Sequence, residues 1–138
     1  MRHMSEIVRH QNPVMLSPGA SVQHACERMR ERGVGAVLVL DAHRHLVGIF
    51  SGRDAVCRVL AAGLDPAKTR LGDVMTRDPA TMPPGKTALE ALHLMQEGGF
   101  RHVPVIDNDK VVGVVSKGDF RGIEQARLDE ETGIWEQR

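Results

Sequence analysis

The chain has 138 residues, 41% of them hydrophobic, which suits one compact soluble unit or two very small ones. Its 18 Lys and Arg residues balance 18 Asp and Glu residues, and the zero net charge argues against nucleic-acid binding by general electrostatic attraction. No apolar run reaches the ~20 residues that span a bilayer, and the two cysteines form no CxxC motif or disulfide framework. We therefore expect a cytoplasmic protein with no nucleic-acid or membrane partner.

The first half of the chain alternates short strand-like and helix-like segments. In chain order they are an extended piece over 14–16, a helix between Ser21 and Gly33, strands over 37–40 and 46–50, and a helix between Ser51 and Gly63. Ser21 is the expected N-cap of the first helix, and Gly33 ends it. The expected apolar faces of the two helices are Val22, Ala25, Cys26 and Met29, and then Ala55, Val56, Val59 and Leu60.

The second half follows the same order. Its elements are an extended piece over 80–82, a helix after Thr87, strands over 103–106 and 111–115, and a helix after Ser116. Thr87 and Glu90 form a capping box at the start of the first of these helices, which ends at Gly98-Gly99. We expect a first repeat over 7–63, a linker over 64–72, a second repeat over 73–124 and a charged C-terminal tail over 125–138.

Identical residues recur between the two halves. A shift of 66 residues aligns ten identities, and after a one-residue deletion the shift becomes 65. Chance would give roughly two or three identities over such a span. A shared hydrophobic pattern does not explain the match, because Gly, Pro and Asp positions align too. We infer a duplication from the pairs Pro13/Pro79, Pro18/Pro84, Gly19/Gly85, Ala25/Ala91, Met29/Met95, Glu31/Glu97, Gly33/Gly99, Val37/Val103, Val39/Val105, Asp41/Asp107, Val47/Val112, Gly48/Gly113, Ser51/Ser116 and Asp54/Asp119.

The β-α-β-β-α order, with Gly-x-x-Ser-x-x-Asp after the third strand, resembles the CBS (cystathionine β-synthase type) domain. The motif occurs at residues 48–54 and again at 113–119. Residues 100–105 also resemble the second-strand motif of the family, and residues 73–76 resemble its lead-in segment. The resemblance covers about residues 7 to 124, and its strength lies in the ordered duplication of motifs that are individually weak.

The resemblance implies an α+β fold in which tandem CBS repeats pack as one pseudo-twofold module. It also implies a homodimer and a regulatory role without catalysis, in which the cleft between the repeats binds AMP, ADP, ATP, S-adenosylmethionine or NAD(H). No cofactor is required and no metal site is expected, whereas an unknown protein target is compatible with the family. The alternative is a structural dimerisation or interaction module without a working ligand site. An enzyme ranks third, because no nucleophile or acid/base pair emerges.

The two aspartates of the motifs, Asp119 and Asp54, match the ribose-binding aspartate of the family. A fixed carboxylate accepts hydrogen bonds from both ribose hydroxyls, and such charge-assisted bonds are strong. Ser116 and Ser51 precede helices, where free N–H groups favour an anion. The same Ser-x-x-Asp pattern is also a capping box with a purely structural role. Both interpretations stay open at this stage.

Adenine needs a flat apolar slot with backbone edges, and a phosphate needs cations. The candidates for the slot are Val115, Phe50, Pro13, Val14, Pro79 and Ala80, each site drawing partly on the other repeat. The candidates for the phosphate are Arg101, His102 and Lys117. The first repeat has Gly35, Ala36 and Gly52 at the aligned positions, and Arg53, which aligns with Gly118, compensates only in part. We therefore expect the second-repeat site to bind more tightly. Arg101 is equally compatible with a plain surface cation.

Three features outside the site have simple explanations. Gly48 and Gly113 would allow close strand packing. His43 and His45 flank a hairpin turn, where solvated histidines are far more common than metal ligands. The tail is either a solvated helix or a docking segment around Trp135.

Overall fold

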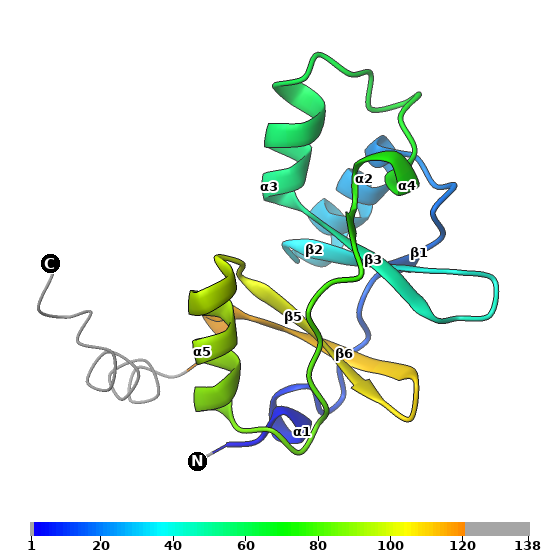
Figure 1. The fold of residues 1–138 in the computed structure, drawn as a ribbon. Helices are drawn as coiled ribbons and strands as arrows, with labels where there is room; N and C mark the ends of the chain where they lie inside the picture. Colours follow the sequence, from blue (N-terminus) through cyan, green and yellow to red (C-terminus); the bar gives the residue numbers. More distant parts are fainter. Residues whose placement is uncertain (1, 121–138) are drawn as a thin grey trace, which may run out of the picture. The chain divides into compact units, whose positions relative to one another are not determined.

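The computed structural model describes residues 2–120, and its contacts divide the chain into two compact units (Figure 1). Within the described residues, the first-repeat unit comprises 12–79 and 109–111, and the second-repeat unit comprises 2–11, 80–108 and 112–120. Each unit combines helices with a small sheet, which confirms the predicted α+β class. The tail over 125–138, with Trp135, lies outside the described residues. No described helix has the length and apolar character of a membrane span.

The first-repeat unit is built on a four-stranded sheet with the order β1-β2-β3-β4. Strand β1 runs parallel to β2, and the pairs β2/β3 and β3/β4 are antiparallel. The elements of the unit are β1 (Met15–Leu16), α2 (Val22–Arg32), β2 (Ala36–Leu40), β3 (Leu46–Ser51), α3 (Gly52–Asp54), η1 (Ala55–Leu60), α4 (Leu71–Val74) and β4 (Thr76–Arg77). The predicted β-α-β-β-α order is therefore present.

Helix α2 has the ends that the sequence predicts. The Ser21 hydroxyl accepts a hydrogen bond from the backbone N–H of His24 at 3.0 Å. Gly33 ends the helix in the left-handed region at φ 63°, which glycine adopts without strain. The buried side of α2 consists of Val22, Ala25 and Met29.

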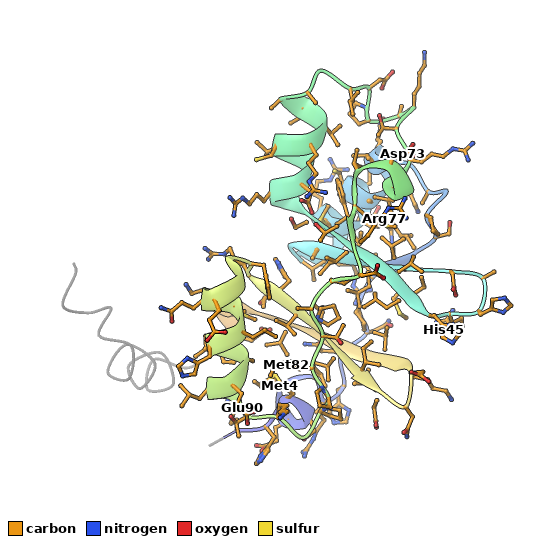
Figure 2. All side chains as sticks on the ribbon, in the orientation of Figure 1. Met4, His45, Asp73, Arg77, Met82 and Glu90 are labelled. Carbon is orange, nitrogen blue, oxygen red and sulfur yellow. The ribbon has the colours of Figure 1, made fainter. Side chains whose placement is uncertain are left out.

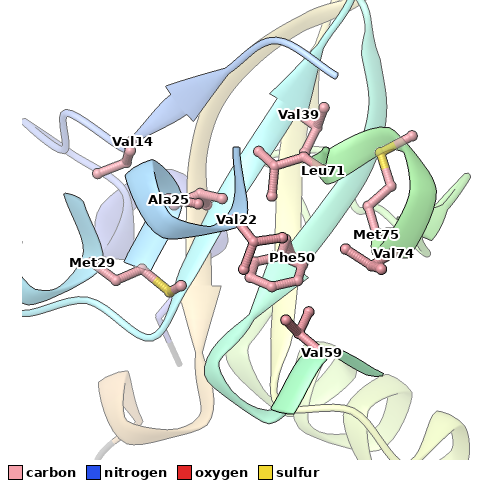
Figure 3. Packing of buried hydrophobic residues seen from close by; sticks show 11 residues of the cluster. Val14, Val22, Ala25, Met29, Val39, Phe50, Val59, Leu71, Val74 and Met75 are labelled. Atoms are coloured by element: carbon pink, nitrogen blue, oxygen red, sulfur yellow. The ribbon is translucent and has the colours of Figure 1, made fainter. Parts of the chain in front are cut away.

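These side chains pack onto Phe50 from β3 and Val39 from β2 (Figure 3). Strand β2 is buried along its whole length, as its continuous apolar sequence requires. Leu71, near the end of the predicted linker, and Val74 and Met75, just after it, complete the cluster. The first repeat therefore does not complete its own core from residues 7–63 alone.

The helix after Ser51 differs from the sequence prediction. It continues from α3 into a π-helical stretch, in which Ala61 N donates to Val56 O at 2.9 Å. Of its predicted apolar face only Val59 is buried, while Val56 and Leu60 are 56% and 65% exposed. The four apolar residues form two adjacent pairs, 55–56 and 59–60. Adjacent side chains on a helix point in different directions, so a narrow contact with the sheet buries only one member of a pair.

The second-repeat unit repeats this plan with a two-stranded sheet of β5 and β6. Its elements are α1 (Met4–Ile7), α5 (Ala88–Gly98), β5 (His102–Asp107), β6 (Lys110–Ser116), of which residues 112–116 belong to this unit, and η2 (Lys117–Asp119). Met82 forms a parallel bridge with Val105, in the place that β1 takes in the first repeat. Met82 and Met4 belong to the core of this unit, and Glu90 lies in the first turn of α5 (Figure 2).

Helix α5 begins with the predicted capping box. Glu90 N donates to the Thr87 hydroxyl at 3.2 Å, and the Glu90 carboxylate accepts from Thr87 N at 3.3 Å. These hydrogen bonds lower the pKa of Glu90, with the backbone bond from Thr87 as the largest cause. Gly99 ends the helix at φ 71°. Helix α2 has Ser21 as its cap, but His24 stands where α5 has Glu90.

Each glycine of the CBS-like motifs packs closely against a segment from another part of its unit. A Cβ on Gly48 would lie 2.8 Å from Met75 Cγ and 3.0 Å from Thr76 O. A Cβ on Gly113 would lie 2.6 Å from Val8 Cβ. Close packing therefore explains both glycines, as proposed above. The repeat bounds of 7–63 and 73–124 were predicted from the internal alignment and stay a prediction. The compact units are bounded differently, because each also includes the segment that packs against its motif glycine.

Candidate functional site

The Ser51–Asp54 motif forms a closed ring of hydrogen bonds at the end of β3. Asp54 Oδ2 accepts from Ser51 N at 2.9 Å and from Ser51 Oγ at 3.0 Å. In return, Asp54 N donates to Ser51 Oγ at 3.2 Å. The first turn of α3 is thereby capped, and one oxygen of the carboxylate, Oδ2, is used in doing so.

The Ser116–Asp119 motif at the end of β6 repeats the two bonds to the carboxylate. Asp119 Oδ2 accepts from Ser116 N at 2.8 Å and from Ser116 Oγ at 3.1 Å. The structural interpretation of both motifs, the capping box, is therefore correct. It does not replace the binding interpretation, because the box uses Oδ2 and leaves Oδ1 for another partner.

The other carboxylate oxygen has different surroundings in the two repeats. Asp54 Oδ1 lies 3.6 Å from Arg58 Nε, and the Asp54 side chain is 15% exposed. Asp119 is exposed, and within residues 2–120 its Oδ1 has no hydrogen-bond or ion-pair partner. Of the two carboxylates, only that of Asp119 presents an exposed oxygen without a partner among residues 2–120.

Two of the three predicted phosphate-binding cations are brought together. Lys117 N donates to Arg101 O at 2.9 Å, directly beside the Ser116 box, and both side chains are exposed. The first repeat makes the equivalent bond from Gly52 N to Gly35 O at 3.0 Å, where neither residue has a side chain. His102, the third predicted cation, is half-buried at the start of β5 and is already engaged in a contact.

The residues predicted to form adenine slots are mostly not exposed. Phe50 and Val115 are fully buried and Val14 is 3% exposed, each within the core of its own unit. A ligand would reach these residues through their backbone and not through their side chains. Pro13 and Pro79 are half-buried in the first-repeat unit, and Ala80 is exposed in the second. That each site draws on both repeats stays a prediction.

The sequence prediction missed two arginines beside the aspartates. Arg58 follows Asp54 by four residues, a spacing that commonly pairs charges on a helix, so the sequence did contain a signal. Arg2 donates from Nη2 to the backbone oxygen of Asp119 at 2.9 Å. No local pattern links Arg2 to Asp119, because 117 positions separate them.

The histidines of the first hairpin belong to its turn. Asp41 Oδ1 accepts from the backbone N–H groups of His43 and His45, both at 2.9 Å. The bond from His45 is the largest cause of a lowered pKa at Asp41. His45 lies directly before β3, where Asp41 N donates to its backbone oxygen at 2.9 Å (Figure 2). Among residues 2–120, no group of three or more His, Cys, Asp or Glu side chains has the arrangement to hold a metal ion.

Comparison with known proteins points to one family. The CBS domain family model matches the chain twice, at residues 4–60 and 71–124. A CBS domain-containing protein of Arabidopsis thaliana is 39% identical over 108 residues, which are 78% of this chain and 20% of that protein. This chain thus spans about a fifth of the length of the Arabidopsis relatives that it matches.

Solved structures agree with this match. A protein with CBS domains from Burkholderia ambifaria is 29% identical, with a TM-score of 0.80 over 85% of this chain and 89% of that one. A CBS domain protein from Pyrobaculum aerophilum, solved in complex with AMP, is 24% identical, with a TM-score of 0.82 over 93% and 98% of the two chains. The chain belongs to the CBS domain family and contains two CBS repeats.

Proposed function

We propose that this chain is a regulatory module that binds an adenosine-containing nucleotide, with AMP as the reference ligand, and that its working site is built on the second repeat. One observation carries the proposal. The carboxylate of Asp119 is exposed, its Oδ1 has no partner among residues 2–120, and it lies two residues after Lys117, whose backbone N–H donates to Arg101 O. In this arrangement the carboxylate would bind the ribose of the nucleotide, and the two neighbouring cations would bind its phosphate.

The chemistry of each contact follows from the groups present. The two ribose hydroxyls donate hydrogen bonds, and a carboxylate held by the Ser116 box accepts them without losing further conformational freedom. The phosphate is an anion, for which a guanidinium offers a planar fork of donors and an ammonium a compact charge. Adenine is left to backbone edges, because Val115 is buried. The AMP complex of the archaeal neighbour, which shares the fold, agrees with this choice of ligand.

We assign the chain a binding role and not an enzymatic one, because its site combines an acceptor and cations without a nucleophile or acid/base pair. The module would act in the cytoplasm, where its free cysteines stay reduced. ATP, ADP, S-adenosylmethionine and NAD(H) share the adenosine moiety with AMP and are the other candidate ligands. No cofactor is needed for such binding, and the regulated target is a further protein.

A structural dimerisation module is the second candidate, and one observation favours it. Val56 and Leu60 are exposed on η1, with Leu64 just beyond at 42%, and a second copy of the chain would cover them. We expect a homodimer at micromolar concentration, and Leu60→Glu should shift it toward monomer. Sedimentation that shows only monomer for the unmodified chain would contradict the dimer.

Melting experiments separate the two candidates. A ligand that binds only the folded state stabilises it by about 2.7 kcal/mol at a hundredfold excess over Kd, which raises Tm by several degrees in a domain of this size. Millimolar AMP, ADP, ATP, S-adenosylmethionine and NADH should be tested in parallel. If none of them changes Tm, the binding proposal fails and the structural module takes its place.

A further inference from the structure

Arg58 follows the binding aspartate of the first repeat by four residues and contacts three groups at once. Its Nε lies 3.6 Å from Asp54 Oδ1. Its Nη1 donates to Val74 O at 3.2 Å and to Met75 O at 3.1 Å. The two carbonyl bonds hold the guanidinium in place by contacts that do not involve the carboxylate.

The position of Arg58 matters because Asp54 has only two carboxylate oxygens. Oδ2 accepts two hydrogen bonds within the Ser51 box, so a ribose would depend chiefly on Oδ1. That oxygen faces a guanidinium, whose positive charge attracts it more strongly than a neutral hydroxyl does. The Asp54 side chain is also only 15% exposed. A ribose hydroxyl would have to compete with Arg58 in a confined space.

The second repeat has no equivalent cation in its sequence. With the shift of 65 that aligns the two motifs, the residue that corresponds to Arg58 is Ile123, whose side chain carries no charge. Asp119 is exposed, and within residues 2–120 its Oδ1 has no partner. Four residues after the aspartate of the motif, the first repeat therefore has a cation and the second has an uncharged side chain.

We propose that Arg58 is a specificity residue that closes the first-repeat site by occupying Asp54, and so leaves the second-repeat site as the one that binds nucleotide. This inference rests on the proposed function. Arg58 acts through Asp54 and the 74–75 carbonyls and does not itself contact the ligand. Its removal should open a ribose site on Asp54 that the unmodified chain does not use.

The test is performed with the Asp119→Ala variant of the full chain, which lacks the second carboxylate. Adenosine is the probe, because the first repeat has Gly35 and Gly52 where the second has its cations. Adding Arg58→Gln should tighten adenosine binding about fivefold in calorimetry, the scale of an exposed ion pair. Arg58→Met, which keeps the length of the side chain without its charge, should give the same gain if loss of the carbonyl contacts is harmless.

A matched control is Arg53→Gln in the same background. Arg53 is an exposed neighbour on α3 with no ion pair among the described residues, so its removal changes the charge equally without freeing Asp54. Circular dichroism and Tm should show that every variant is folded. If Arg58→Gln and Arg58→Met leave adenosine binding unchanged or weaken it while the unmodified chain binds AMP, the role of Arg58 is wrong and the proposed function stands. If the unmodified chain binds neither AMP nor adenosine, both fail.

Discussion

Asp54 and Asp119 each accept two hydrogen bonds at Oδ2 from the serine three residues earlier, and they differ in what lies near Oδ1. The first is 15% exposed beside Arg58, and the second is exposed and unpaired within residues 2–120. Next to the first box, Gly52 N donates to Gly35 O, and next to the second, Lys117 N donates to Arg101 O. Under the proposed function, the duplicated fold has its structural motif twice and its binding groups once.

The capping box shows why both copies persist whether or not they bind a ligand. Each box satisfies donors at the start of a helical turn, and loss of such a cap costs about 1 kcal/mol. The Ser and Asp therefore have a structural reason to be present in both repeats. We propose that the residues around the box decide binding, and those residues differ between the repeats.

The largest expected effect is the loss of AMP binding on removal of the second carboxylate. Asp119→Ala should weaken AMP binding about a hundredfold, since hydrogen bonds to a charged group contribute up to about 3 kcal/mol. Asp54→Ala should change AMP affinity less than about twofold, because Arg58 already occupies that carboxylate. Calorimetry on the two variants measures this, and equal losses would remove the distinction between the repeats.

The next effect concerns the glycines, which the two repeats share. Gly113→Ala should lower the free energy of unfolding by about 1–3 kcal/mol, the range for overpacking, because the new methyl group meets Val8 Cβ at 2.6 Å. Gly48→Ala should cost less, because the nearest atoms belong to the flexible Met75 side chain. Gly52→Ala is the control, since nothing lies within 4 Å of a Cβ there. Urea unfolding that ranks Gly52→Ala with the other two would contradict this packing.

A smaller effect should separate phosphate from ribose. Arg101→Ala should weaken AMP binding about tenfold, the lower end for a hydrogen bond to a charged group at an exposed position. The affinity for adenosine should not change. Lys117→Ala should act in the same direction. Titrating each variant with AMP and with adenosine gives the comparison. An Arg101→Ala defect of the same size for both ligands would show that Arg101 does not contact the phosphate.

The smallest effect distinguishes the starts of α2 and α5. The pKa of Glu90 is lowered in the folded chain, so its contribution to stability is present above its unfolded pKa and is lost as pH falls through the folded value. Glu90→Gln should therefore destabilise the chain slightly at pH 7, and the difference in Tm should vanish in acid. Helix α2 has His24 at this position, so His24→Gln should show no such acid-dependent loss. A Glu90→Gln defect that persists once the pH is well below the folded pKa of Glu90 would refute the assignment.

Much of this fold could be predicted from local patterns. Ser21 with Gly33 and Thr87 with Glu90 signal helix ends through short-range chemistry, and the alignment of Ser51 with Ser116 signals the duplication. The exposure of Leu60 could not be predicted, because an apolar residue on a helix does not reveal which side meets the sheet. The association of Val8 with Gly113 is a long-range contact with no local signal.

The candidate site was predicted in part for the same reason. Asp119, Arg101 and Lys117 stand in motifs that a sequence displays directly. Phe50 was expected to offer its ring to adenine, but an aromatic side chain at the end of a buried strand serves the core first. The pairing of Arg58 with Asp54 has a recognisable spacing in the sequence. The hydrogen bonds from Arg58 to Val74 O and Met75 O join residues that only the fold brings together.

The most direct test maps AMP onto the backbone of the unmodified, isotope-labelled chain by NMR. AMP should bind with about one molecule per chain and shift the amide resonances of Ser116, Lys117 and Asp119 far more than those of Ser51, Gly52 and Asp54. The backbone N–H of Lys117 should be among the most affected, because it bonds to Arg101 O beside the expected phosphate. Shifts centred on Ser51 and Asp54, or no saturable shift at millimolar AMP, would contradict the account.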